Sequence, residues 1–349
     1  MDHPAIALLL SLMSIPSTSN NEHQIASFLS THLKSLNYTV ESIPISQNSS
    51  RCNIYAYLGT TRKTRILLTA HMDTVPPHIP PTVNHITQTI HGRGSSDDLG
   101  PLVAQIFALE ELRTSSQIQE GDVGIVFVVG EENGGHGMLA VNSWEGLSWE
   151  AGIFAEPTQN KLAKGHKGQL VFEIIAEGRA CHSGYPELGT NAISSLLAVL
   201  NELSATNWGK DLLGKGTFNI GRIEGGEKHN ILAGEAKALC EVRVVEGLEW
   251  VKGKVRGIVE KYKRKGVRLE WIFEYPGVLL EWKGIEGFEA EAVSFGTDIP
   301  RLKEGMCGKR VLYGPGSILV AHGREEFIEV KELVESIEGY KKLVMHFLK

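Results

Sequence analysis

Residues 122–132, DVGIVFVVGEE, constrain the fold more than any other stretch of this chain. The run is apolar almost throughout, which suits a strand in the middle of a sheet that is covered on both faces. The segment WEAGIFAEPT (149–158) has the same character, and PLVAQIFALEELRT (101–114) carries the spacing of an amphipathic helix. Helices that alternate with apolar strands predict an α/β sandwich around a mostly parallel sheet.

The pattern of elements changes near Gly165. From there the chain reads strand, helix, strand, strand, helix, strand, beginning with GQLVFEIIAEGRA and ending with GVRLEWIFEYP. This βαββαβ order is that of a ferredoxin-like α+β module. The α/β pattern resumes around Gly277 and closes with a helix at about 328–348. We therefore expect a main domain in two parts, 1–163 and 277–349, with an inserted domain at 164–276.

Composition excludes several functional classes. The 349 residues carry a formal net charge of -6, so nothing indicates a nucleic-acid partner or a general affinity for anionic membranes. No run of 18 apolar residues is present, so we expect no transmembrane helix. The four cysteines form no CxxC pair, which argues against a structural zinc module.

The first segment, MDHPAIALLLSLMSIPS, predicts a helix packed on the main domain. It does not have the features of a signal peptide, because Asp2 precedes the apolar run, no Lys or Arg does, and no cleavage site of the A-x-A kind follows. By default this favours a cytoplasmic location.

The stretch RILLTAHMDTVPP (65–77) ends an apolar run with His71 and Asp73. Side chains two apart in a strand point the same way, so Asp73 could accept a hydrogen bond from the imidazole. That arrangement is usual behind a metal-binding histidine, and it leaves the other ring nitrogen free to be a ligand. Taken alone, the pair also fits an ordinary His–Asp contact in a loop.

Metal-ligating side chains follow four further segments. They are Asp97 and Asp98 in HGRGSSDDLG, Glu131 and Glu132 in VVGEENGG, Glu156 in FAEPT, and His322 in YGPGSILVAHGREE. One carboxylate at a strand end is commonplace, but two histidines and several carboxylates at the ends of strands of one sheet are not. In open α/β sheets, ligands bind at the carboxyl ends of the strands.

Charge counting favours two metal ions. Asp97, Glu132 and Glu156 supply three negative charges and a bound hydroxide a fourth, which two Zn²⁺ ions would balance. One carboxylate that bridges both ions would hold them about 3.5–4 Å apart. Each ion would then have one histidine, one glutamate of its own and the shared aspartate. Glu131 points elsewhere than its neighbour and is left to act as general base.

Several motifs together resemble one known family. AHMDTVPP, VVGEENGGHGM, GHKG, CHSGYPELG, GTDIP and LYGPGSILVAH are similar, in order and over nearly the whole chain, to the dinuclear zinc metallopeptidase family. That family includes glutamate carboxypeptidase, acetylornithine deacetylase, succinyl-diaminopimelate desuccinylase and aminoacylase. Within it the chain looks most like the fungal secreted carboxypeptidases, which leaves its location open.

The resemblance implies a role for each matching residue. His71, Asp97 and Glu156 would hold one zinc, and Asp97, Glu132 and His322 the other. Asp73 would orient His71, and Glu131 would be the acid/base. The inserted domain would be a lid, and a homodimer through it is possible, since such relatives include both dimers and monomers. Its residues His182, Asn230 and Arg243 would contact the oxyanion and the polar groups of the substrate, and Thr297 would lie in a loop near the substrate.

The expected activity is therefore zinc-dependent hydrolysis of an amide next to a free carboxylate, as in a carboxypeptidase. Co²⁺ or Mn²⁺ could replace Zn²⁺. The substrate would be a small peptide or an N-acyl amino acid, since an N-acyl-amino-acid deacylase would use the same residues. A hydrolase of one biosynthetic intermediate and a non-catalytic scaffold on the same fold are further alternatives.

Overall fold

The computed structural model describes residues 2–47 and 49–349. It has two compact units, each described here by itself. Unit 1 comprises Met1–Lys164, Leu280–Glu291 and Thr297–Lys349, and unit 2 comprises Gly165–Leu279 and Ala292–Gly296. The short segment Ala292–Gly296, which the sequence pattern places in the main domain, thus belongs to the inserted unit.

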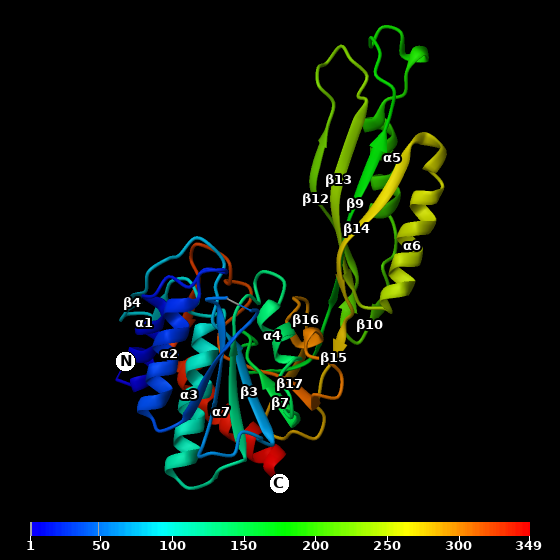
Figure 1. Cartoon of the computed structure of the whole chain (residues 1–349). Coiled ribbons are helices and arrows are strands. Elements are labelled where there is room, and N and C mark those ends of the chain that lie inside the picture. Colours follow the sequence, from blue (N-terminus) through cyan, green and yellow to red (C-terminus); the bar gives the residue numbers. More distant parts are fainter. Residues whose placement is uncertain (1, 48) are drawn as a thin grey trace. The chain divides into compact units, whose positions relative to one another are not determined.

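A six-stranded sheet forms the centre of unit 1 (Figure 1), in the order β1-β2-β6-β3-β7-β17. The four strands β6, β3, β7 and β17 are parallel, and β1 and β2 form an antiparallel edge. The bounds are β1 (Thr39–Pro44), β2 (Cys52–Tyr57), β3 (Ile66–His71), β6 (Val123–Val128), β7 (Trp149–Phe154) and β17 (Cys307–Leu312). Every residue of β3 and β6 is buried, which explains why their sequences are apolar without alternation.

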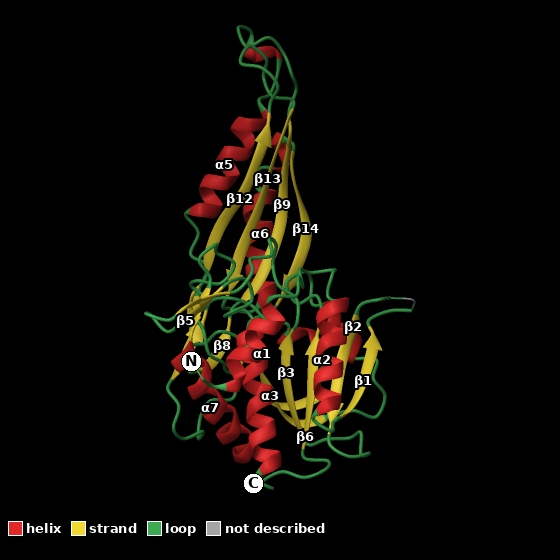
Figure 2. Ribbon diagram, turned by 90° about the vertical axis from the view of Figure 1, so that its left-hand side faces the viewer, coloured by secondary structure: helices red, strands yellow, loops and turns green. Residues whose placement is uncertain are grey.

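Helices cover this sheet (Figure 2), with α1, α2 and α3 in front of the strands in that view. The helices of unit 1 are α1 (Pro4–Met13), α2 (His23–Ser35), α3 (Leu99–Thr114), α4 (His136–Val141) and α7 (Val330–Leu348). Helix α3 packs on β3, α1 and α7, and α2 packs on β1 and β2. The N-terminal apolar segment therefore forms a helix of the core, as its sequence indicates.

Gly339 in α7 allows close packing against Tyr313. A Cβ at position 339 would overlap the Tyr313 hydroxyl, and the backbone carbonyl of Tyr313 accepts a hydrogen bond of 2.7 Å from Tyr340. Alanine normally stabilises a helix over glycine by up to about 1 kcal/mol. At position 339 we expect the opposite, a loss of about 1–3 kcal/mol in the free energy of unfolding, because the core is overpacked.

Denaturant unfolding of Gly339→Ala checks this, with Gly257→Ala as the control. Gly257 lies in helix α6 (Leu248–Glu260), and a Cβ there would meet no atom within 4 Å. The control should be neutral or slightly stabilised. Equal stabilisation of both variants would contradict the packing argument.

Unit 2 contains the βαββαβ module that the sequence indicates. Its sheet has the order β12-β13-β9-β14, with all neighbours antiparallel, and α5 and α6 pack on it (Figure 2). The bounds are β9 (Gly168–Glu177), α5 (Ala192–Ser204), β12 (Thr217–Gly225), β13 (Glu235–Val244), α6 (Leu248–Glu260) and β14 (Val267–Tyr275). In β13 every second residue is buried, because only one face of this sheet is covered.

Short strands complete the fold in three small sheets. They are β4 (Thr82–Asn84), β5 (Thr89–His91) and β18 (Phe327–Glu329); β8 (Leu162–His166), β15 (Val278–Leu279) and β16 (Ala290–Val293); and β10 (Lys210–Asp211) with β11 (Gly214–Lys215). None of the four cysteines is in a disulfide. Among the described residues, no helix has the length and apolarity needed to cross a membrane.

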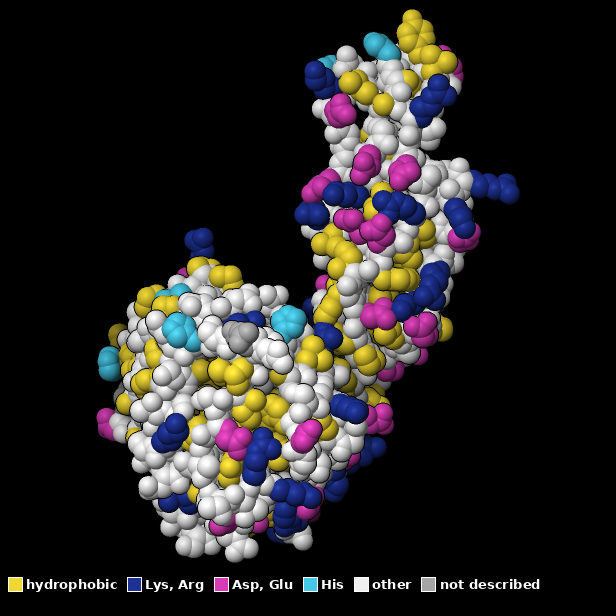
Figure 3. All heavy atoms as spheres, viewed as in Figure 1, with side chains coloured by type: hydrophobic (Ala, Val, Ile, Leu, Met, Phe, Trp, Pro, Cys, Tyr) yellow, Lys and Arg dark blue, Asp and Glu magenta, His cyan; other side chains and the backbone are white. Residues whose placement is uncertain are grey.

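The surface carries both signs of charge. In the face shown in Figure 3, basic and acidic side chains are interspersed over each unit. This face therefore shows no large cluster of Lys and Arg side chains of the kind that binds nucleic acid.

Candidate metal centre

The carboxyl ends of three adjacent parallel strands bring the candidate ligands together in unit 1. His71 is the last residue of β3, Glu132 lies in the turn after β6, and Glu156 follows β7 by two residues. Asp97 lies in the loop before α3, and His322 in the loop between β17 and β18. This is the edge at which open α/β sheets bind ligands.

Asp97 is at the centre of the cluster. Its Oδ1 lies 3.0 Å from Nε2 of His71, and its Oδ2 lies 3.1 Å from Nε2 of His322. Nε2 of His322 is also 2.9 Å from Oε1 of Glu132. The ligand atoms of His71, Asp97 and Glu156 lie within 4.8 Å of one another, and so do those of Asp97, Glu132 and His322.

This donor set fits two divalent cations. Each group offers one imidazole nitrogen and carboxylate oxygens, which are the ligands that zinc takes in catalytic sites, and each has fewer than the four ligands of a closed structural site. One oxygen of Asp97 faces each histidine, as a carboxylate that bridges two ions requires. The first group is fully buried, whereas the side chain of His322 in the second is 51% exposed.

Electrostatics also favour cations here. Hydrogen bonds with Asp97 and Glu132 raise the pKa of His322 to about 10. Burial alone would lower the pKa of His71, but Asp97 and the other nearby carboxylates outweigh it, and the pKa lies well above its usual value. Burial, and then repulsion from Asp97 and Glu131, raises the pKa of Glu156. The cluster therefore holds more carboxylates than its two histidines can neutralise.

The contact between His71 and Asp73 differs from the expected one. Nδ1 of His71 lies 2.8 Å from the backbone carbonyl of Asp73 and 3.7 Å from its carboxylate. The imidazole N–H therefore donates to the backbone. The buried Asp73 carboxylate instead accepts the backbone N–H groups of Glu131 (3.0 Å) and Glu132 (3.3 Å) and the hydroxyl of Ser19 (2.8 Å).

Glu131 and Glu132 lie in a turn and not in the strand that the sequence extends to residue 132. Strand β6 ends at Val128, and Gly130 then adopts φ +73°, which favours glycine. Glu132 turns toward His322, and Glu131 is free of that contact. Burial raises the pKa of the Glu131 carboxyl well above its usual value, and repulsion from Glu132 adds to this.

Thr297, which the sequence places in a loop near the substrate, lies beside the cluster. With Asp298 it lines a small cavity of about 10 Å³ that His71 and Glu156 also line. Asp298 was not anticipated from the sequence, although it follows Thr297 in the GTDIP motif. Burial raises its pKa to about 7, and its Oδ2 has no hydrogen-bond partner among the described residues.

Asp98, which the sequence offers beside Asp97 as a candidate ligand, is in neither group of ligand atoms. It is fully buried, and its Oδ2 accepts the backbone N–H of His71 at 3.2 Å. The two adjacent aspartates thus contact opposite parts of one histidine, Asp97 the ring and Asp98 the backbone.

The candidate substrate-binding residues of unit 2 fall into two places. The N–H of Ser183 donates to the carbonyl of Asn230 (3.0 Å), and His182 pairs with Ile231, so His182 and Asn230 share one tip of the unit. Arg243 is near the other end of β13, where its Nε lies 2.7 Å from Glu241. From Glu235 to Arg243 the strand advances by eight residue steps, about 27 Å.

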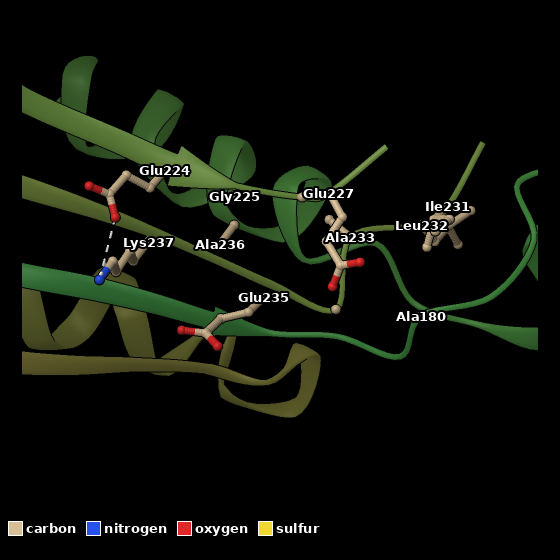
Figure 4. A pocket seen from close by; sticks show the side chains of 12 residues that line it. Ala180, Glu224, Gly225, Glu227, Ile231, Leu232, Ala233, Glu235, Ala236 and Lys237 are labelled. Carbon is tan, nitrogen blue, oxygen red and sulfur yellow. Dashed lines mark ion pairs between the residues drawn. The ribbon is translucent and has the colours of Figure 1, made fainter. Parts of the chain in front are cut away.

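The tip also contains an open cavity of about 450 Å³ (Figure 4). Glu224 and Lys237 form an ion pair of 3.4 Å at its wall. It is lined by Ala180, Glu224, Gly225, Gly226, Glu227, Ile231, Leu232, Ala233, Gly234, Glu235, Ala236 and Lys237. No histidine or cysteine is among them, so this cavity does not offer a second metal site of the kind found in unit 1.

Each unit contains a segment that matches a known family model. Residues 164–267 match the family model described as Peptidase dimerisation domain, and residues 53–147 match that of Peptidase family M28. The first match covers most of unit 2, and the second includes His71, Asp97 and Glu132.

Individual proteins match over almost the full chain. A Peptidase M20 domain-containing protein of Schizosaccharomyces pombe is 43% identical over 347 residues, which cover 99% of this chain and 85% of that protein. A probable carboxypeptidase of Aspergillus clavatus is 38% identical over 370 residues, covering 98% and 88%.

Solved structures share the fold. A tripeptidase from Staphylococcus aureus superposes with a TM-score of 0.82 at 23% identity, covering 98% of each chain. A dinuclear metal-binding peptidase of Bacillus subtilis, from the M20 family, superposes with a TM-score of 0.74 at 15% identity, covering 99% of this chain and 98% of that one.

Proposed function

Because this chain belongs to the M20 peptidase family, we propose that it is a dinuclear metal-dependent carboxypeptidase, which hydrolyses the amide bond next to a free carboxylate. One observation carries the proposal: Asp97 directs one carboxylate oxygen to each of two histidines, and each histidine has a further glutamate within reach. The probable carboxypeptidases among the relatives support the class of reaction.

The residues that would hold the metal ions follow from the two groups. His71, Asp97 and Glu156 would take one Zn²⁺, and Asp97, Glu132 and His322 the other, with Co²⁺ or Mn²⁺ as substitutes. When bound, the ions would polarise the scissile carbonyl and lower the pKa of a water molecule. Asp73 fixes the turn that carries Glu131 and Glu132, and its carbonyl fixes the ring of His71.

Glu131 is the proposed acid/base. It adjoins a ligand but is not drawn into the contact with His322, and burial raises the pKa of its carboxyl well above its usual value. A raised pKa suits a carboxylate that must accept and return a proton. Glu131 takes a proton from the attacking water and later returns it to the leaving nitrogen. Thr297 borders the reacting groups from its loop.

The expected metal content is two ions per chain. With only one dication, the three carboxylates of Asp97, Glu132 and Glu156 would retain excess negative charge. Metal analysis of the protein at saturating zinc checks this number. A fully active protein that holds at most one ion would contradict the dinuclear proposal.

A substrate panel separates carboxypeptidase from deacylase activity. N-blocked dipeptides with a free C-terminus should be cleaved faster than N-acetyl amino acids. The same dipeptides with an amidated C-terminus are the control, and they should react poorly because Arg243 pairs well with a carboxylate and not with an amide. Faster cleavage of the N-acetyl amino acids would identify a deacylase instead.

His182 is proposed to stabilise the oxyanion in the site of a partner chain. His182 and Asn230 lie about 27 Å or more along β13 from Arg243, so the three residues of one lid cannot all contact one small substrate. A homodimer through the lid, which the dimerisation-domain match supports, lets the tip of one chain complete the site of another.

His182→Ala is expected to lower kcat by about 10²–10³-fold, the loss of one oxyanion donor, with metal content unchanged. Mixing this variant with an inactive Glu131→Gln protein should restore part of the activity, since a hybrid dimer has one site with both residues intact. Subunit exchange without any recovery would show that each chain supplies its own histidine.

A further inference from the structure

We propose that Glu326 and Arg93 act as a positioning pair that holds Asp97 and His322 in place for the metal ions. The inference rests on the metal centre of the proposed function and assigns two residues to it that contact no ligand atom. Both side chains are almost fully buried, Glu326 at 1% and Arg93 at 2% exposed. They come from the two loops that carry Asp97 and His322.

The Glu326 carboxylate shapes the loop of the bridging ligand. Its Oε1 accepts three backbone N–H groups of that loop, from Gly94 (3.0 Å), Ser96 (3.1 Å) and Asp97 (3.2 Å). Its Oε2 accepts Nη1 of Arg93 at 2.5 Å. One carboxylate thus fixes three successive parts of the loop, ending at Asp97 itself.

Arg93 connects this loop to the other histidine. Its Nη2 donates to the backbone carbonyl of His322 at 3.2 Å, while Nη1 is held by Glu326. His322 has φ +64°, a left-handed conformation that costs a residue other than glycine free energy and persists only where its surroundings hold it. The guanidinium fork therefore fixes the backbone from which His322 reaches Asp97 and Glu132.

A purely structural role explains this arrangement poorly. A buried ion pair is weak evidence for stability, because apolar residues of the same volume are often as stabilising. Here a charged pair lies beside a cluster that is already rich in carboxylates. Glu326 accepts the backbone N–H of Asp97, and Arg93 donates to the backbone carbonyl of His322, so the pair contacts the backbone of two ligand residues. Partners behind metal ligands typically change metal affinity by about 10–100-fold.

The two residues predict different patterns of metal loss. Glu326→Gln keeps the volume but removes the charge, and it should weaken both Zn²⁺-binding steps about 10–100-fold, because Asp97 serves both groups. Arg93→Lys keeps the positive charge opposite Glu326 and loses the second arm to His322. It should mainly weaken binding of the Zn²⁺ held by Asp97, Glu132 and His322, the binding step that His322→Ala should abolish.

The experiment is a Zn²⁺ titration of metal-free protein in competition with a chromophoric chelator, alongside thermal unfolding. Glu110→Gln is the matched control: Glu110 accepts hydrogen bonds from Tyr38 and Arg113 in a half-buried network. It lies 11 residues into α3 from Leu99, about 16 Å along the helix. This variant should lower Tm and leave both Zn²⁺ affinities unchanged.

The outcomes separate the two proposals. An unmodified chain that binds no Zn²⁺ contradicts the metal centre itself. Two normal binding steps in folded Glu326→Gln, or an equal loss of affinity in Glu110→Gln, overturns the positioning role alone. Should Glu326→Gln not fold, Arg93→Lys decides: selective loss of the His322-dependent step supports the pair, and unchanged binding overturns it.

Discussion

Replacing Glu131 by glutamine is expected to lower kcat by about 10²–10⁴-fold while the protein keeps its metal ions. The amide preserves the shape of the side chain but cannot take a proton. The contact with His322 is made by Glu132 and not by Glu131, so the ligand set stays complete. Steady-state kinetics together with metal analysis measure both parts of the prediction.

Glu132→Gln is the matched control, since it makes the same chemical change one residue away. Glu132 lies 2.9 Å from His322 in the second group of ligands, so this variant should lose metal affinity. A near-normal kcat in Glu131→Gln would mean that another residue is the base. Loss of metal from both variants would place Glu131 among the ligands.

Asp97→Asn is expected to remove both metal ions and, with them, the activity. The bridge needs negative charge on both oxygens, which face His71 and His322. Loss of a residue behind a ligand already costs about 10–100-fold in affinity, so loss of the shared ligand should exceed about 100-fold. Metal analysis after dialysis, with titration of Zn²⁺ back into the protein, measures the effect.

Asp98→Asn is the control for this substitution. Burial raises the pKa of Asp98 well above its usual value, so an amide resembles the form of this side chain that burial favours. The amide oxygen of this variant could still accept the N–H of His71, as Asp98 does at 3.2 Å. We expect two ions per chain in this variant. Retention of both ions by Asp97→Asn would contradict the bridging role.

Burial leaves two kinds of pattern in this sequence, continuous apolar runs and regular alternation, and both predict elements of the fold. The strand that ends at His71 and the strand before Glu131 are mostly apolar, and both are central and parallel in the structure. In unit 2, alternate residues of β13 face the helices, and this alternation made the βαββαβ order readable. The sequence of Ala292–Gly296 has no pattern that indicates its place in unit 2.

The geometry of the site is less visible in the sequence. Side chains two apart in a strand point the same way, which predicts that the Asp73 carboxylate contacts the His71 ring. The strand ends at His71, so this rule does not apply to Asp73, and the ring contacts the Asp73 backbone instead. Arg93 and Glu326 are 233 positions apart in loops where charged residues usually face solvent. Only the folded chain shows that they are buried together.

The unequal burial of the two ligand groups has a kinetic consequence. His71, Asp97 and Glu156 are all buried, whereas half of the His322 side chain meets solvent. In the dinuclear centre proposed above, a chelator or a competing cation would reach the ion held by His322 first, and the ion held by His71 would exchange more slowly. Soaking in a second metal should therefore produce a mixed centre, with the new ion in the outer position, so that the occupants of one dinuclear centre record the order in which metals were supplied.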